Sequence, residues 1–296
     1  MNAMRILVRF KVTPDYEALR EADWAAGEGD CSDRSGAAEA DARAGSGVAS
    51  GVETRYVPRI LDCFDESALE MALRMRDATA SDGVPVDLGA ISVGGREVEP
   101  HLKTLQALGY ERATRVHVDA GLDFAPTVTA SIIARYVQET NKTDLLMLGC
   151  RNGPDDAGTL PFLVAEELGW PCVTQVTEVM VLSDDRVRVA HMVDDGLLRV
   201  TVRLPCVLGV GNAVVARLRV PTLTARLARR EAHIEHVQTS DLGIDVVSGL
   251  AGESYVLTGL EVVRRDRSGT IIGGQTPREK AQTLFDSHLK SLMGKL

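Results

Sequence analysis

Short apolar runs alternate with helical segments along the first two thirds of the chain, and this alternation limits the possible folds more than any other feature. Runs typical of buried strands cover residues 5–10, 86–93, 114–118 and 144–149. Apolar residues at helical spacing cover residues 65–76, 99–108, 126–138 and a segment from about residue 161. This order predicts βαβ units, and therefore a doubly wound α/β fold around a mostly parallel sheet. Asp65 is predicted to cap the first helix.

Beyond Trp170 the pattern changes to long extended runs. Residues 172–182, 187–193 and 197–204 are separated by short acidic turns, which predicts an antiparallel meander, and a further strand follows over 206–210. From Arg217 onward a basic stretch leads into segments with little core material and a final helix near Pro277–Leu292. We predict an α/β core over residues 1–225 and an extended C-terminal arm over 226–296 that packs on a partner subunit.

The charge is concentrated in one segment. The chain has 33 basic and 42 acidic residues, a net charge of −9, and residues 21–54 contribute −6 of it in a stretch rich in Ala and Gly. Such a composition buries too little apolar surface to offset the entropy of ordering, so we predict a mobile insert over 21–54.

Composition also limits the partners and the chemistry. The acidic balance and the few aromatic residues argue against nucleic acid, and no apolar run approaches the ~20 residues of a membrane span. Five cysteines without a CxxC spacing, and the lack of a signal pattern, predict reduced thiols and a cytoplasmic protein. No hydrolase or metal motif occurs, and no nucleophile has an evident base. The sequence therefore predicts a binding protein without catalytic side chains of its own.

The loop that follows the strand 144–149 is the strongest candidate for a binding site. Residues 149–159 are small and polar and lead into a helix, whose first N–H groups and dipole favour a phosphate. Thr159 adds a hydroxyl, and Asp155 can accept a bond from a ribose. The alternative is an ordinary loop in which Asp156 or Thr159 caps the helix. Ligands of such sheets bind at the carboxyl ends of the strands, which here also include 11–15 and 93–95.

Several motifs, taken in order, resemble the beta subunit of electron transfer flavoprotein over nearly the whole chain. The opening residues 5–15 keep Lys11 and Asp15, and residues 64–75 are similar to the first long helix of the family. Residues 144–171 follow its nucleotide loop and helix without a gap. Asp194-Asp195-Gly196 with Pro205–Leu208 matches its signature, and residues 269–279 are similar to its C-terminal motif.

The resemblance implies a heterodimer with an electron transfer flavoprotein alpha subunit. In this family the fold is adenine-nucleotide alpha-hydrolase-like, and the alpha subunit carries most of the FAD contacts. The beta chain adds one wall of the flavin site and binds AMP or, in bifurcating relatives, a second FAD. Electrons come from a flavin dehydrogenase and leave for a downstream acceptor, and the flavin supplies the chemistry. A stand-alone adenine-nucleotide sensor, or a remnant that keeps only the dimer interface, are the alternatives.

The resemblance also implies the residues that line the nucleotide site. These are Arg9, Asp62, Val93, Asn152, Asp155, Gly158, Thr159 and Leu160. The chain departs from the family at the helix start, where Ala157–Pro161 replaces side-chain donors and Pro161 removes an N–H group. Asp62 would repel a phosphate, and Arg9 could offset that charge.

The family's dehydrogenase-docking loop corresponds to residues 211–220. Here it reads GNAVVARLRV, one residue longer than usual and without the usual acid. Val214, Val215 and Leu218 are the candidate apolar anchors. A divergent loop predicts an unusual electron donor.

Overall fold

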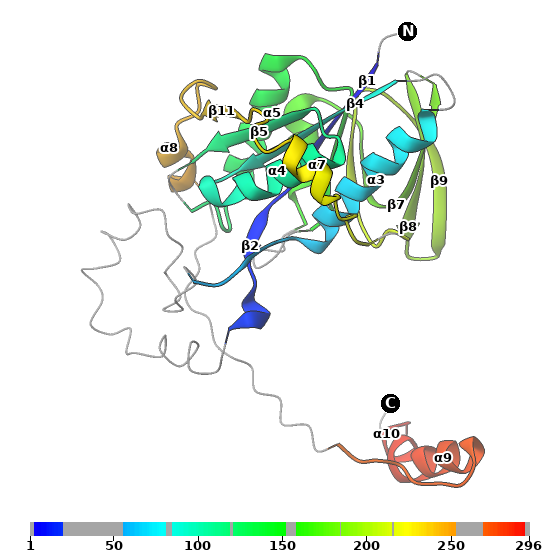
Figure 1. Cartoon of the computed structure of the whole chain (residues 1–296). Coiled ribbons are helices and arrows are strands. Elements are labelled where there is room, and N and C mark those ends of the chain that lie inside the picture. Colours follow the sequence, from blue (N-terminus) through cyan, green and yellow to red (C-terminus); the bar gives the residue numbers. More distant parts are fainter. Residues whose placement is uncertain are drawn as a thin grey trace. The chain divides into compact units, whose positions relative to one another are not determined.

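The computed structural model describes residues 3–19, 56–80, 85–118, 121–151, 158–183, 185–214, 216–252 and 269–293 (Figure 1). The chain forms two compact units, Met1–Leu260 and Glu261–Leu296. The larger unit contains the sheet and its helices, and the smaller one contains a C-terminal helix. The predicted insert over 21–54 lies outside the described residues.

A nine-stranded sheet forms the centre of the larger unit, and its strands follow the order β11-β5-β4-β1-β6-β10-β7-β8-β9. The pairs from β11 to β7 are parallel, whereas β7-β8-β9 is an antiparallel meander. The strands are β1 (Met4–Arg9), β4 (Val86–Val93), β5 (Arg112–His117), β6 (Leu145–Gly149), β7 (Cys172–Ser183), β8 (Arg186–Val193), β9 (Gly196–Arg203), β10 (Cys206–Val210) and β11 (Glu235–Gln238). The predicted doubly wound fold with a meander is confirmed.

Helices cover both faces of this sheet. Apolar residues of α3 (Cys63–Thr79) and α4 (Glu99–Leu108) bury one face, and those of α5 (Pro126–Thr140) and α6 (Leu160–Leu168) bury the other. Successive residues of β1 point to opposite faces, so that Ile6 and Val8 pack with α3 while Leu7 packs with α5. Strands buried on both sides read as continuous apolar runs, which explains why the sequence predicts them well.

Smaller elements complete the larger unit. They are the two-stranded ribbon of β2 (Val12–Pro14) and β3 (Arg59–Leu61), the turns η1 (Tyr16–Ala18) and η3 (Arg96–Val98), α7 (Leu223–Ala228) and α8 (Val246–Ala251). α7 lies against α4 (Figure 1). The first residues of the predicted arm thus belong to the larger unit, since β11 pairs with β5. That the arm packs on a partner subunit stays a prediction.

The predicted cap of α3 is wrong by three residues. The helix begins at Cys63, and its N-cap is Asp62, whose Oδ1 accepts a hydrogen bond from the N–H of Phe64 at 3.1 Å. Asp65 therefore lies in the first turn, where its side chain is free to make longer-range contacts. α4 ends at Gly109 in the left-handed conformation (φ 100°), as the sequence predicts.

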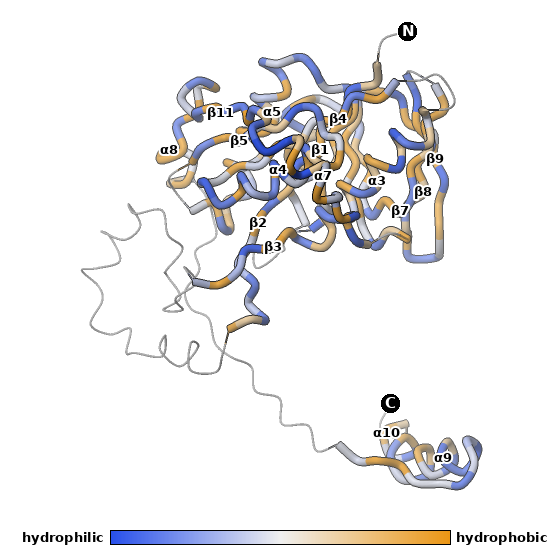
Figure 2. The backbone as a smooth tube through the Cα atoms, viewed as in Figure 1, coloured by the Kyte–Doolittle hydropathy of each residue, from blue (hydrophilic) through white to orange (hydrophobic). Residues whose placement is uncertain are grey.

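The smaller unit is an amphipathic helical segment, formed by α9 (Pro277–Leu284), η4 (Phe285–Leu289) and α10 (Lys290–Met293). Thr276 caps it, because its hydroxyl accepts from the N–H of Glu279 at 3.2 Å. Hydrophobic and hydrophilic residues alternate along it in Figure 2. Its large apolar side chains are exposed within the described residues: Leu284, Phe285, Leu289, Leu292 and Met293. None of the described helices is long and apolar enough to cross a membrane.

Candidate functional site

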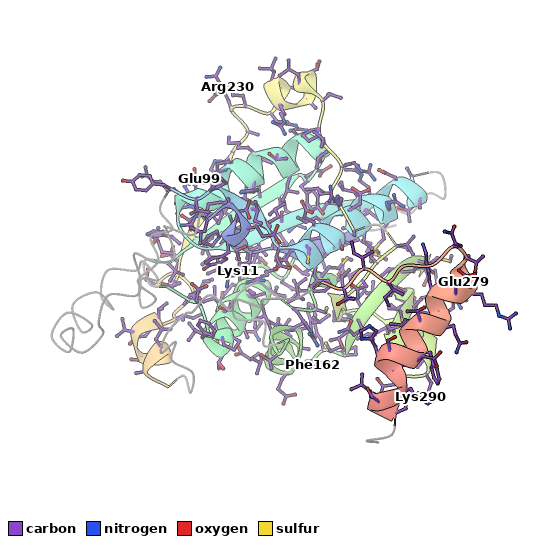
Figure 3. All side chains as sticks on the ribbon, turned by 90° about the horizontal axis from the view of Figure 1, so that it is seen from below. Lys11, Glu99, Phe162, Arg230, Glu279 and Lys290 are labelled. Atoms are coloured by element: carbon purple, nitrogen blue, oxygen red, sulfur yellow. The ribbon has the colours of Figure 1, made fainter. Side chains whose placement is uncertain are left out.

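The carboxyl ends of β1 and β6 form the switch point of the sheet. From β1 the chain passes through α3 to β4 on one side, whereas β6 pairs with the other side of β1. The helices that follow the two strands, α3 and α6, cover opposite faces. Figure 3 looks onto this edge, with Lys11 between the two helical layers and Phe162 on the α6 side. Ligands of open α/β sheets bind at such a point.

Asp65 occupies the centre of this edge with a fully buried carboxylate. Its Oδ2 accepts from the N–H of Lys11 at 2.7 Å, and its Oδ1 accepts from the N–H of Gly149 at 2.8 Å. Nη1 of Arg9 lies 3.6 Å from Oδ2. One side chain thus joins the ends of β1, β6 and α3. Our sequence reasoning missed this role, because the only local signal was an acid in the first turn of a helix.

The charge of Asp65 is poorly compensated. Burial raises the pKa of this carboxyl to about 6, Asp62 adds to the rise, and Arg9 together with the N–H groups of Gly149 and Lys11 opposes it. At neutral pH the edge therefore contains a buried negative charge. The two N–H groups bound to Asp65 are occupied by the protein's own carboxylate and are not offered to a ligand phosphate.

Gly149 permits this arrangement because a larger residue would not fit. A Cβ at this position would lie 2.8 Å from Oδ1 of Asp65 and 2.9 Å from Cβ of Phe64. The first turn of α3 therefore packs directly on the end of β6.

The structure separates the predicted site residues into two groups. Arg9 and Asp62 lie near the start of α3, where Arg9 is nearly buried and faces Asp65. Gly158, Thr159 and Leu160 lie at the start of α6. Val93 ends β4 and is half-buried, and Asn152 and Asp155 lie outside the described residues.

The start of α6 lacks one backbone donor and a side-chain cap within the described residues. Gly158 is left-handed (φ 63°), and the side chain of Arg151 runs beside it, with Cγ 3.5 Å from the position of an added Cβ. Thr159 is at the N-cap and makes no capping bond within the described residues, while Pro161 removes one N–H from the first turn. Among the described residues of this loop, Arg151 and Thr159 therefore carry the side-chain donors that an anion could bind.

The loop 211–220 is fixed at its start. The N–H of Gly211 donates to the carbonyl of Val176 at 2.9 Å, and a Cβ on Gly211 would lie 2.7 Å from Oε1 of Gln175. Among the candidate anchors, Val214 is 82% exposed, Leu218 packs partly on the core, and Val215 lies outside the described residues.

No metal site accompanies these features in the described part of the chain. No group of three or more His, Cys, Asp or Glu side chains there is placed to hold an ion. Cys63, Cys172 and Cys206 form no disulfide within the same residues.

Comparison with known proteins identifies the family of this chain. The family model described as "Electron transfer flavoprotein domain" matches residues 50–242. A protein of Escherichia coli (strain K12) named "Putative electron transfer flavoprotein subunit YgcR" is 32% identical over 98% of this chain and 99% of its own. The mitochondrial electron transfer flavoprotein subunit beta of Arabidopsis thaliana is 30% identical, and the bovine subunit beta is 28% identical, each over 68% of this chain and 77% of its own.

The chain therefore belongs to the electron transfer flavoprotein family. Within that family it is a beta-like subunit, since the matching bovine and Arabidopsis thaliana proteins are both named subunit beta. The predicted family is confirmed. Membership implies an alpha-subunit partner and the involvement of a flavin.

Proposed function

We propose that this chain is the beta subunit of a heterodimeric electron transfer flavoprotein that passes electrons from a flavin dehydrogenase through FAD to a downstream acceptor. The FAD is shared with the alpha subunit, which makes most of its contacts. When bound, the flavin supplies the redox chemistry, and this chain contributes a wall, a dielectric environment and partner surfaces. Family membership over nearly the full length of the E. coli relative supports this proposal.

The observation that carries the heterodimer is the amount of apolar surface left uncovered in the described residues. The hairpin of β8 and β9 exposes Met192, Val193, Leu197 and Leu198, each between 39% and 51%. The amphipathic C-terminal helix exposes a second apolar face. Apolar surface of this extent on both units is typical of a subunit that binds another chain.

The second ligand of the proposal is AMP or a second FAD at the carboxyl edge of the sheet. Thr159 at the start of α6 and Arg151 just after β6 would approach its phosphate, since Asp65 already uses the N–H groups of Lys11 and Gly149. Arg9 would limit the repulsion between that phosphate and the carboxylates near α3. We place the donor dehydrogenase on the loop 211–220 and the protein in the cytoplasm, where cysteines stay reduced.

Co-expression with the cognate alpha chain tests this function. We expect a yellow 1:1 complex whose flavin is reversibly reduced. Acid release of bound ligands followed by mass spectrometry then identifies AMP, a second FAD or FAD alone. A colourless pair that does not associate overturns the proposal. A monomer that binds AMP without FAD would instead support the adenine-nucleotide sensor.

A further inference from the structure

Arg219 ties the end of the loop 211–220 to helix α3. Its Nε lies 3.0 and 3.1 Å from the two carboxylate oxygens of Glu70, and its Nη2 donates to Oε1 at 2.8 Å. Its Nη1 donates to Oδ2 of Asp77 at 2.6 Å, and its backbone N–H donates to Oε2 of Glu70 at 3.1 Å. Glu70 and Asp77 are two turns apart on one face of α3, so a single guanidinium reaches both.

Glu70 makes this contact from the interior of the protein. It is 3% exposed and also accepts from Nε of Arg74 at 3.2 Å. Burial alone would raise the pKa of Glu70, but the side-chain and backbone hydrogen bonds from Arg219 outweigh it and hold the pKa below its usual value. The carboxylate is therefore charged at neutral pH. A charge in this position is tolerated only when it is paired and hydrogen-bonded, so Arg219 and the loop are held firmly.

The clamp of Arg219, Glu70 and Asp77 completes the fixation of the loop. Gly211, the first residue of the loop, lies close against Gln175. Leu218 packs on the core next to Arg219. Between and beyond these anchors, Val214 and Val220 are 82% and 81% exposed. Two exposed aliphatic side chains thus lie close to fixed residues, Val214 near Gly211 and Val220 next to Arg219, and offer an apolar contact for a recess on another protein.

We propose that Arg219 is a positioning residue for the electron donor: through Glu70 and Asp77 it holds the loop 211–220 in the conformation that presents Val214 and Val220 to an apolar recess of the dehydrogenase. This role rests on the proposed function. When the clamp is lost, only a fraction of the molecules has a competent loop, and the apparent affinity for the donor falls by that fraction. The flavin itself is not affected.

The variants separate the clamp from the surface of the loop. Arg219→Gln removes the clamp from the loop side, and Glu70→Gln removes it from a buried position that a donor cannot touch. Arg219→Lys keeps a charge and should rescue in part. The double variant E70Q/R219Q avoids an unpaired buried carboxylate where R219Q alone folds poorly. Arg226→Gln, an exposed arginine of α7, is the matched control for the change in charge.

Two measurements on the full heterodimer give the outcome. Hydrogen–deuterium exchange of residues 211–221 should become about tenfold faster in R219Q, E70Q and the double variant, and should not change in R226Q. With the dehydrogenase that reduces the wild-type complex, KM for the complex should rise about fivefold at unchanged kcat. Reduction by dithionite should stay at the wild-type rate.

Exchange and KM at wild-type values in R219Q and E70Q would overturn the positioning role, as would a fall in kcat at constant KM. The proposed function fails in a different way: the wild-type complex would then accept no electrons from any dehydrogenase, although its exchange pattern is normal.

Discussion

Two buried carboxylates on helix α3 show how a counter-ion decides what a buried charge does. Asp65 and Glu70 are five residues apart, and both are nearly inaccessible to solvent. Asp65 has two backbone donors and an arginine nitrogen no closer than 3.6 Å, and its pKa is raised to about 6. Glu70 has a guanidinium at 2.8 Å, and its pKa is lowered. Burial acts in the same direction on both groups, and direct contact with a cation reverses the result.

The difference assigns the two regions different tasks. At the carboxyl edge the charge of Asp65 is buried, and its hydrogen-bond donors come from the ends of β1 and β6. These contacts stabilise the packing of the two strands against α3. At the loop 211–220 the charge of Glu70 pairs with Arg219, which is itself partly exposed. This ion pair stabilises the conformation of a surface loop. The first region should therefore respond to mutation mainly in stability, and the second in donor binding as well as in stability.

The largest effect is expected for Asp65→Ala. This change leaves the buried N–H groups of Lys11 and Gly149 without their acceptor and Arg9 without its nearest carboxylate, which should lower the free energy of unfolding by about 4 kcal/mol. Urea denaturation at pH 7 measures it. Asp62→Ala, which removes the cap of α3 and leaves the carboxylate of Asp65 in place, is the control and should cost about 1 kcal/mol. Equal losses in the two variants would show that Asp65 does not join the strand ends.

The raised pKa of Asp65 predicts that the free energy of unfolding depends on pH, and this is the second-largest expected effect. Because the folded-state pKa lies above the unfolded one, the folded protein binds this proton more tightly, and the stabilisation is complete below about pH 4 and lost as pH rises through 6. Relative to Asp65→Asn, the wild type should lose about 2.4 kcal/mol between pH 4 and pH 7. The difference between the two denaturation curves cancels the other titrating groups. A difference that does not vary with pH would contradict the raised pKa.

Glu70→Gln should reveal a pH dependence of stability that is opposite in sign to that of Asp65 and smaller. A carboxyl whose pKa is lowered on folding stabilises above its unfolded pKa, and this contribution is lost as pH falls through the folded value. At pH 7 the variant should be less stable than the wild type by about 2 kcal/mol, the size of a hydrogen bond to a charged group. In acid, once pH falls below the folded-state pKa of Glu70, the two proteins should converge. A gap that widens in acid would be incompatible with the clamp.

The sequence was sufficient for the sheet because its central strands are buried on both faces. The strand β11 was not predictable in the same way: Glu235–Gln238 contains one apolar residue, Val237, and becomes a strand only by pairing with the edge of β5. Its Glu235 accepts from Thr114 and Tyr136 at 2.7 and 2.9 Å. These partners are about a hundred residues away, so no local pattern reveals them.

The site was predicted less completely for the same physical reason. The switch point follows from the order of strands, and the resemblance supplied Arg9 and Asp62. Asp65 was predicted only as a helix cap and Arg219 was not singled out, because their roles depend on contacts 54, 84 and 149 residues away along the chain. Arg219 was visible only as part of a basic stretch. Buried carboxylates become recognisable as such once the fold brings their donors to them.

The smallest effect on stability, and the sharpest test of the contrast, is expected at Val214. Its side chain is 82% exposed, so Val214→Ala should change the free energy of unfolding by less than about 0.5 kcal/mol. If Val214 enters a recess of the donor, the same change should raise KM by about fivefold, which corresponds to roughly 1 kcal/mol of contact energy. Val247→Ala is the matched control, since Val247 on α8 is 77% exposed and lies outside the loop. A larger rise in KM for V247A than for V214A would place the donor elsewhere and would leave the clamp with no surface to position.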